Sequence, residues 1–259
     1  MNKIARAFEG KKALIGFVTG GDPSLEMTEQ LVLAMERAGA DIVEIGIPFS
    51  DPTAEGPVIE AASMRALAAG CTVEKLFLLV QRLRKQVRIP LMFMTYANPV
   101  FAYGKEAFMH RCQAVGIDGV IIPDTPFEEK GEFLQACQAH GIDFISMVAP
   151  TSHERVSAIA KESEGFLYCV SSLGVTGVRS SFSEQLCEVV QAAKAATDTP
   201  CAIGFGVSDP EQAKAMAQIA DGVIVGSAIV RIVAEYGESS VPHVERFVRA
   251  LRQALDAQA

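Results

Sequence analysis

The stretch AGADIVEIGIPFSDPTAEGP, residues 38–57, holds the pattern that decides the fold of this chain. Gly39 ends a helical pattern, an apolar run typical of a buried strand follows almost at once, and a loop rich in proline comes next. The stretch also holds two carboxylates, Glu44 within the apolar run and Glu55 in the loop. A carboxyl group in a buried strand must either be paired or have its pKa raised by poor solvation. The two groups are therefore candidates for general acid/base chemistry.

The same order of elements recurs along the chain. The junctions at 115–118 and 140–143 repeat the formula of residues 38–41, in which glycine closes a helical pattern and aspartate precedes the next apolar run. Strands that alternate with helices predict a parallel sheet. Eight βα units in 259 residues predict an α/β fold, a single (β/α)8 TIM barrel, with residues 1–259 as one domain. The predicted strands are 13–19, 41–46, 90–95, 117–122, 142–148, 165–170, 199–204 and 221–225.

Two further helices extend this plan. Residues 2–9 are predicted as an extra N-terminal helix, and a short phosphate-binding helix is expected after strand 8, before the last helix at 240–256. An open, doubly wound sheet is the alternative architecture. It is disfavoured because the sequence at 20–23, Gly-Gly-Asp-Pro, lacks the GxGxxG dinucleotide-binding pattern and instead predicts a helix capped by Asp22.

Composition excludes several classes of protein. With 49% hydrophobic and 21% charged residues the chain suits a globular protein, and its net charge of −8 disfavours nucleic acid or an anionic membrane as partner. No apolar run approaches the roughly 20 residues that span a bilayer, so a cytoplasmic location is predicted. The six cysteines lack metal-binding spacing and are predicted to be reduced thiols. The histidines form no ligand pattern, so no metal site is expected.

A glycine turn follows each of the last two predicted strands. GFGVS, at 204–208, follows the seventh strand, GSAIV, at 226–230, follows the eighth, and each is expected to open a helix. A helix N-terminus offers unpaired N–H groups and the positive end of its dipole to an anion, and this position in barrels frequently holds phosphate. The two turns therefore predict a phosphate site. Glycine that serves turn geometry alone is the alternative.

The segment after the sixth predicted strand, residues 171–181, is polar, rich in glycine and too long for a simple turn. It is predicted to be a mobile lid, in which Thr176 can donate a hydrogen bond. An ordinary surface loop is the alternative.

Six motifs occur together in an order that is specific to one family. They closely resemble the tryptophan synthase alpha chain, over about residues 3 to 256. The resemblance implies a carbon–carbon lyase of tryptophan biosynthesis. This enzyme cleaves indole-3-glycerol phosphate by retro-aldol chemistry to indole and glyceraldehyde 3-phosphate, with no cofactor in the alpha chain. The motifs are FVTGGDP (17–23), EIGIPFSDPTAEGP (44–57), YANP (96–99), GVTG (174–177), GFGVS (204–208) and GSAIV (226–230).

The resemblance assigns catalytic roles to the two carboxylates. Glu44 stands at the family's catalytic glutamate on the second strand, and Glu55 stands at its second catalytic carboxylate in the following loop. Glu44 is then the proton shuttle to indole C3, and Glu55 accepts the indole N–H. The family usually has aspartate at the second position, and we expect the loop backbone to compensate for the extra methylene of Glu55. A salt-bridged Glu44 and a solvated Glu55 are the structural alternatives.

The resemblance also implies a substrate-binding set and a residue that faces the partner. Asp124 either caps the helix after it or, as in the family, bonds the lid residue Thr176 on a loop that faces the beta subunit. Barrel packing is the alternative for the aromatic positions, and backbone groups at the glycine turns and the lid would hold the phosphate. The implied set is Phe17, Tyr96, Tyr168, Thr176, Gly177, Phe205, Gly206, Gly226 and Ser227.

The implied assembly is an alpha2beta2 heterotetramer with the tryptophan synthase beta subunit, in which pyridoxal phosphate belongs to the beta partner. Two alternatives stay open. One is a stand-alone barrel enzyme, either an indole-glycerol-phosphate lyase that releases free indole or another phosphate-sugar enzyme. The other is a weakly active chain that activates the beta subunit allosterically.

Overall fold

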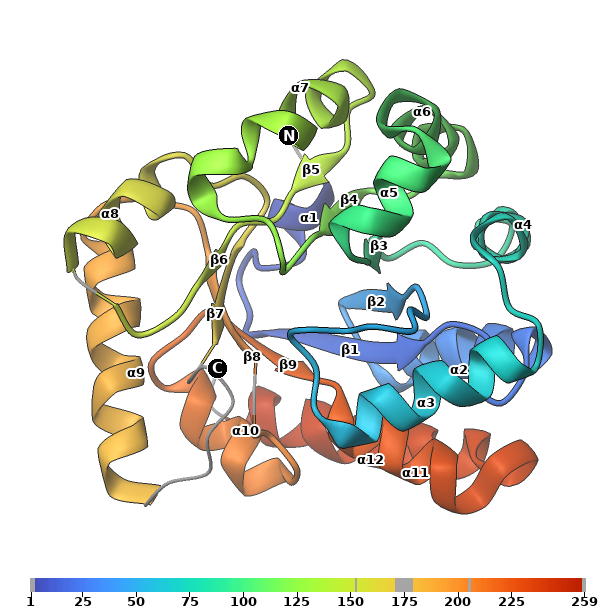
Figure 1. The fold of residues 1–259 in the computed structure, drawn as a ribbon. Coiled ribbons are helices and arrows are strands. Elements are labelled where there is room, and N and C mark those ends of the chain that lie inside the picture. The colour runs from blue at the N-terminus through green and yellow to red at the C-terminus, as the bar shows by residue number, and fades with distance from the viewer. Residues whose placement is uncertain (1–2, 152, 171–178, 205, 258–259) are drawn as a thin grey trace.

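The computed structural model describes residues 3–151, 153–170, 179–204 and 206–257. Nine parallel strands of these residues form one sheet, in the order β5-β4-β3-β2-β1-β9-β8-β7-β6. Seven predicted strands appear within their expected bounds, so the predicted alternation of strands and helices is confirmed (Figure 1). The strands are β1 Ala13–Thr19, β2 Ile42–Gly46, β3 Leu91–Met94, β4 Gly119–Ile121, β5 Asp143–Phe144, β6 Met147–Val148, β7 Leu167–Val170, β8 Cys201–Gly204 and β9 Gly222–Val225.

The predicted strand 142–148 is divided into β5 and β6, and the sheet closes there. β5 pairs with β4, and β6 pairs with β7. Between them, the Ile145 N–H donates to the Val120 carbonyl at 2.9 Å, and the Ser146 carbonyl accepts from the Tyr168 N–H at 3.0 Å. One continuous segment therefore bonds to neighbours on both sides. This makes the nine strands equivalent to the eight of a closed barrel.

Helices after the strands cover the outside of the sheet (Figure 1). The additional helix expected after the last strand is α11, which stands between β9 and the final helix α12. The helices are α1 Lys3–Arg6, α2 Leu25–Ala38, α3 Pro57–Ala68, α4 Val73–Leu83, α5 Ala97–Tyr103, α6 Lys105–Val115, α7 Gly131–Ala139, α8 His153–Lys161, α9 Arg179–Lys194, α10 Pro210–Ala217, α11 Ser227–Tyr236 and α12 Val241–Asp256, with 3-10 turns at Phe127–Glu129 and Gly237–Ser239.

The start of α2 differs from the prediction. Its N-cap is Ser24, whose hydroxyl accepts the Met27 N–H at 3.1 Å. Asp22 instead binds the guanidinium of Arg65 through both oxygens, at 2.8 and 2.7 Å. Asp22 therefore ties the loop after β1 to helix α3, and the prediction that it caps a helix was wrong.

Helix α1 closes the end of the barrel at which the strands begin. Its residue Ile4 is fully buried, and Phe8 just after it is nearly so. A Cβ on Gly119 would lie 2.8 Å from Ile4 Cδ1, and a Cβ on Gly222 would lie 2.8 Å from Phe8 Cε1. The glycines on these two strands thus make room for the side chains of Ile4 and Phe8. These apolar side chains fill this end of the barrel, so we expect a polar site toward the other end.

Aspartates at the same end bind the starts of neighbouring strands. Asp41, Asp118 and Asp221 each accept an N–H at the start of a neighbouring strand, at 2.8–3.0 Å. Each also donates its own N–H to the carbonyl of that same neighbouring residue. The carboxylate therefore satisfies a backbone donor that would otherwise lie at the strand end without a partner.

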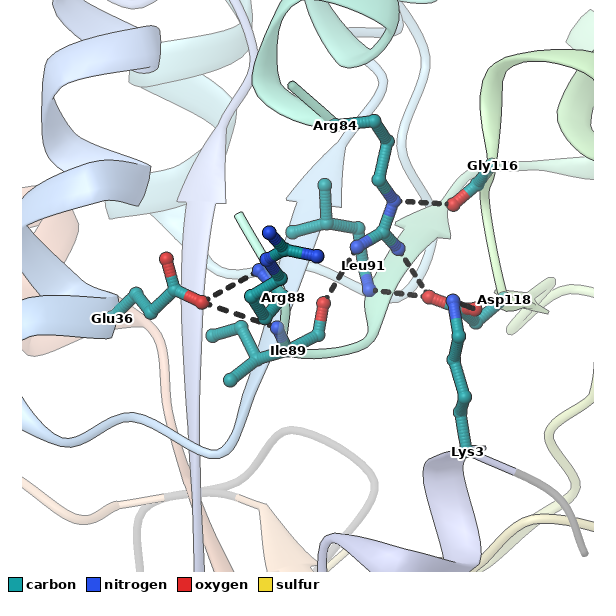
Figure 2. A network of polar contacts seen from close by, with 8 residues as sticks. All are labelled: Lys3, Glu36, Arg84, Arg88, Ile89, Leu91, Gly116 and Asp118. Carbon is teal, nitrogen blue, oxygen red and sulfur yellow. Dashed lines mark hydrogen bonds and ion pairs between the residues drawn. The ribbon is translucent and has the colours of Figure 1, made fainter. Parts of the chain in front are cut away.

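Asp118 is the centre of the network in Figure 2. Its carboxylate accepts from the Leu91 N–H and from Lys3 Nζ, both at 3.0 Å, and it forms an ion pair with Arg84. Arg84 also donates to two backbone carbonyls, at 2.6 and 2.7 Å. Beside it, the Glu36 carboxylate accepts two N–H groups of the segment that leads into β3. The network joins α1, α2, α4 and the starts of β3 and β4.

We predict that Asp118→Ala destabilises the protein by about 3 kcal/mol. The change leaves the half-buried Arg84 without its ion-pair partner and the Leu91 N–H without its acceptor. Denaturant unfolding measures the change. The control is Glu128→Ala, which removes an ion pair with Arg155 between two exposed side chains and should leave the unfolding midpoint nearly unchanged. Equal midpoints for the two variants would contradict the assigned role of Asp118.

Candidate active site

Glu44 points into the barrel from the middle of β2. In the sheet register it lies between Phe17 on β1 and Met92 on β3. Its exposed fraction is 0%, and neither carboxylate oxygen has a hydrogen-bond partner among the described residues. Burial therefore raises the pKa of Glu44 to about 8. The group holds a proton at neutral pH and can give it to a base or to a carbon centre.

Glu55 lies half-buried in the loop between β2 and α3. Burial first, and the negative charge of Glu60 second, raise the pKa of Glu55 to about 7. A nearby like charge favours the neutral form, as burial does. The two carboxyl groups thus titrate in sequence, and near neutral pH one can serve as an acid while the other serves as an acceptor.

Tyr168 lies on β7 beside the first of these carboxyl groups. Burial, followed by the charge of Glu44, raises the pKa of Tyr168 well above its ordinary value. Its ring occupies space that a side chain on β8 would fill, because a Cβ on Gly204 would lie 2.3 Å from Tyr168 Cε1. Gly204 therefore lets the ring approach the strand closely, and the phenol stays protonated.

Glycines also leave space for the ring of Phe17, on the other side of the barrel. A Cβ on Gly46 would lie 2.6 Å from Phe17 Cζ, and a Cβ on Gly226 would lie 3.4 Å from the ring. The ring also packs in a buried cluster with Ala62 of α3 and Val230 of α11. Phe17 thus joins the barrel wall to the two helices that follow β2 and β9.

Gly46 and Gly204 were not predicted as site residues. The signal for them is the period of two along a strand, which places Gly46 on the face of Glu44. Glycine inside a strand indicates that another group approaches closely. Here that group is an aromatic ring of the candidate site.

Tyr96 and Asp124 organise the ends of β3 and β4. The Tyr96 hydroxyl accepts the Ala54 N–H at 3.2 Å. Both oxygens of Asp124 accept the Ala97 N–H, at 3.0 and 3.2 Å. Asp124 therefore binds the first N–H of α5, and the alternative that it caps the helix after it is wrong, because α7 has Lys130 at its N-cap.

The glycine turns after β8 and β9 differ from each other. Helix α11 begins at Ser227 directly after Gly226, and no side chain caps it. Helix α10 begins only at Pro210, and Asp209 caps it by accepting the Gln212 N–H at 2.9 Å. The prediction that both turns open a helix was wrong for the first, since Gly206 lies in a connecting turn with φ +79°. The uncapped N–H groups of α11 are the stronger anion-binding feature.

Three predicted substrate-binding residues, Thr176, Gly177 and Phe205, lie outside the described residues, as does the segment 171–178 of the predicted lid.

A cavity of about 570 Å³ lies at the opposite end of the barrel from Glu44 and Glu55. Its lysines are already engaged. Lys11 pairs with Asp41, Lys194 pairs with Asp221, and Lys12 donates to the Ala220 carbonyl. The volume of this cavity therefore does not identify it as the active site. The raised pKa values of Glu44 and Glu55 mark the candidate site at the other end.

Neither a metal centre nor a membrane span appears in the part of the chain that the structure describes. No group of three or more His, Cys, Asp or Glu side chains there is arranged to hold a metal ion. No helix there is long and apolar enough to cross a bilayer.

The fold is that of an α/β-barrel protein, and two carboxyl groups with raised pKa values lie inside the barrel and in the loop that follows β2. The sequence model of the tryptophan synthase alpha chain family matches residues 4–258. The chain belongs to this family, and the carbon–carbon lyase activity expected from its motifs is the activity of the family.

Relatives and solved structures agree with this placement. The tryptophan synthase alpha chain of Alkaliphilus metalliredigens is 51% identical and covers 93% of this chain and 91% of its own length. That of Lacticaseibacillus casei is 46% identical and covers 100% of this chain and 97% of its own length. A crystal structure of the alpha subunit from Legionella pneumophila has a TM-score of 0.90 at 36% identity and covers 99% of both chains.

We predict that Glu44→Gln gains stability over the wild type as pH rises. The folded protein holds the Glu44 proton up to about pH 8, whereas the unfolded chain releases it near the ordinary carboxyl pKa. The wild type therefore loses stability through this window, by an amount on the order of a few kcal/mol, and the glutamine variant does not. Denaturant unfolding at about pH 5 and about pH 9 measures this. Parallel profiles for the two proteins would contradict the buried, unpaired state of Glu44.

Proposed function

We propose that Glu44 and Glu55 are the acid/base pair that cleaves indole-3-glycerol phosphate to indole and glyceraldehyde 3-phosphate in this chain. The observation that carries the proposal is the fully buried carboxyl group of Glu44, which has no partner among the described residues. With a pKa of about 8, it holds a proton to donate at neutral pH. A barrel residue of this kind that served only structure would be paired.

In the proposed reaction, Glu44 first gives its proton to C3 of the indole ring, which places positive charge on the ring. Glu55 accepts the indole N–H and stabilises that cation. The Glu44 carboxylate then takes the proton of the glycerol hydroxyl next to the ring. The bond from C3 to the glycerol carbon breaks, its electron pair returns to the ring, and the hydroxyl carbon becomes the aldehyde. Glu44 ends protonated again, so the cycle balances.

We propose that Phe17, Tyr96 and Tyr168 line the indole pocket between these carboxyl groups. The phosphate would bind at the start of α11, to the backbone N–H groups at Gly226 and Ser227, because no side chain caps that helix. Family resemblance adds Gly206 and Phe205 after β8, and Thr176 and Gly177 of the lid, to the binding set. No metal or cofactor is required for these steps.

We further propose a tryptophan synthase beta subunit as partner, in an alpha2beta2 assembly whose pyridoxal phosphate belongs to the beta subunit. A structure of the alpha2beta2 complex from Pyrococcus furiosus, described as showing mutual activation, matches this chain with a TM-score of 0.87 at 34% identity and covers 94% of it. The loop of Asp124 would face the partner. Six free cysteines fit a reducing compartment, which supports a cytoplasmic location, and we treat residues 1–259 as one barrel domain.

Steady-state release of indole from indole-3-glycerol phosphate, measured with and without beta subunit, tests the function. A large gain on addition of the beta subunit is the expected result. High activity of the chain alone would indicate a stand-alone lyase, and activation of the beta subunit without cleavage would indicate an allosteric activator.

We predict that Glu55→Gln abolishes indole formation, because glutamine cannot carry the negative charge that stabilises the ring cation. The indole assay measures it. The control is Glu60→Gln, an exposed neighbour that contacts no reacting atom in the proposed reaction and should keep activity. Near wild-type turnover by the Glu55 variant would show that the charge is not used.

The pH dependence of kcat/KM offers a separate test. We predict that it rises through about pH 7 as Glu55 ionises and falls through about pH 8 as Glu44 loses its proton. Because the charge of Glu60 raises the pKa of Glu55, Glu60→Gln should move the acidic limb to lower pH and leave the basic limb in place. A shift of the basic limb alone would contradict the assignment.

A further inference from the structure

Tyr96 lies where the loop that carries Glu55 meets the end of β3. It follows the strand Leu91–Met94 and directly precedes α5. Only 2% of its surface is exposed. A tyrosine buried to this extent must find a hydrogen-bond partner for its hydroxyl. That partner comes from a segment about 40 residues earlier in the chain.

The hydroxyl and the ring of Tyr96 contact two points of the same loop. The hydroxyl accepts the N–H of Ala54, the residue before Glu55, at 3.2 Å. The ring packs against Phe49 with a centroid distance of 5.4 Å. One rigid side chain therefore holds the loop both near its start and beside its carboxylate.

The rest of the loop offers little other anchorage. Its first residue, Ile47, donates a backbone hydrogen bond to the Met94 carbonyl at 2.8 Å, and the Ser50 hydroxyl donates to its neighbour Asp51. Within the described part of the chain, the hydrogen bonds that join residues 48–55 to other segments all go to the Tyr96 hydroxyl. The Tyr96 hydroxyl therefore holds the backbone on one side of Glu55, and the start of α3 at Pro57 holds it on the other.

Electrostatics agree with this geometry. Burial first, and the negative charge of Glu55 second, raise the pKa of Tyr96 well above its ordinary value. The carboxylate therefore lies near the phenol oxygen, and the phenol is neutral at any pH at which the protein works. A neutral anchor can hold the loop without replacing Glu55 as the charged group.

We propose that the Tyr96 hydroxyl is a positioning group that fixes the backbone next to Glu55 and so sets where the Glu55 carboxylate meets the substrate. This role rests on the proposed function of Glu55 and goes beyond the lining of the pocket by the Tyr96 ring. A misplacement of about 1 Å costs on the order of 100-fold in rate.

Tyr96→Phe tests the proposal, because it removes the hydroxyl and keeps the ring against Phe49. We expect kcat to fall by about 10- to 100-fold with little change in KM. The acidic limb of the pH profile should move to lower pH, since a loosened loop gives Glu55 more water. The matched control is Tyr103→Phe, which removes a hydroxyl of α5 that donates to Glu74 at 2.9 Å and should change neither quantity. A rise in KM with unchanged kcat would overturn the proposal.

Amide hydrogen exchange supplies a readout that does not depend on activity. Loss of the hydroxyl should speed exchange of the Ala54 N–H by roughly 2- to 10-fold, the worth of one hydrogen bond, and Tyr103→Phe should leave it unchanged. An unchanged exchange rate of the Ala54 N–H in Tyr96→Phe would contradict the proposal that the Tyr96 hydroxyl holds the loop. A wild-type protein that forms no indole would instead refute the proposed function, and the exchange experiment would still decide whether Tyr96 holds the loop.

Discussion

The interior of a small barrel must be filled by the alternate side chains of its own strands, and the site of this protein depends on that constraint. Ile4 and Phe8 fill the end where the strands begin. Toward the other end, glycine takes several interior positions, and the rings of Phe17 and Tyr168 occupy the space. Glu44 shares this interior without a partner among the described residues. Its proton affinity is therefore set by the shape of the barrel, more than by a charged neighbour.

The two ends of the barrel treat carboxyl groups in opposite ways. At the end where the strands begin, Asp41, Asp118 and Asp221 each bind a backbone N–H and a cation, and so contribute stability. At the end where the strands finish, the pKa values of Glu44 and Glu55 are raised by burial. A paired carboxylate is poor at exchanging protons near neutral pH, whereas a desolvated one is suited to it. The same residue class thus supports the fold at one end and offers chemistry at the other.

The strands and the position of Glu44 within a buried strand could be predicted from sequence because local patterns fix them. Glycine before an apolar run marks the end of a helix. A charged residue such as Glu44 within that run can be recognised whichever strands lie beside it. The break between β5 and β6 could not be predicted, since it depends on how this segment pairs with β4 and β7, which are distant in the sequence. The partners of Asp22 and Asp124 were missed because they lie 43 and 27 residues away along the chain.

One error had a readable cause. The start of α10 was expected at the glycine turn after β8, yet Asp209 followed by Pro210 is a standard signal for an N-cap and the first helical residue.

The central claim is that Glu44 is a neutral acid at the pH of the cell. Carbon-13 NMR titration of glutamate side-chain carboxyl groups tests it most directly, with the Glu44→Gln variant identifying the Glu44 resonance. We predict a pKa of about 8 for that resonance. A resonance that titrates in the ordinary carboxyl range, about 4 to 5, would contradict the account, because Glu44 would then have no proton to give.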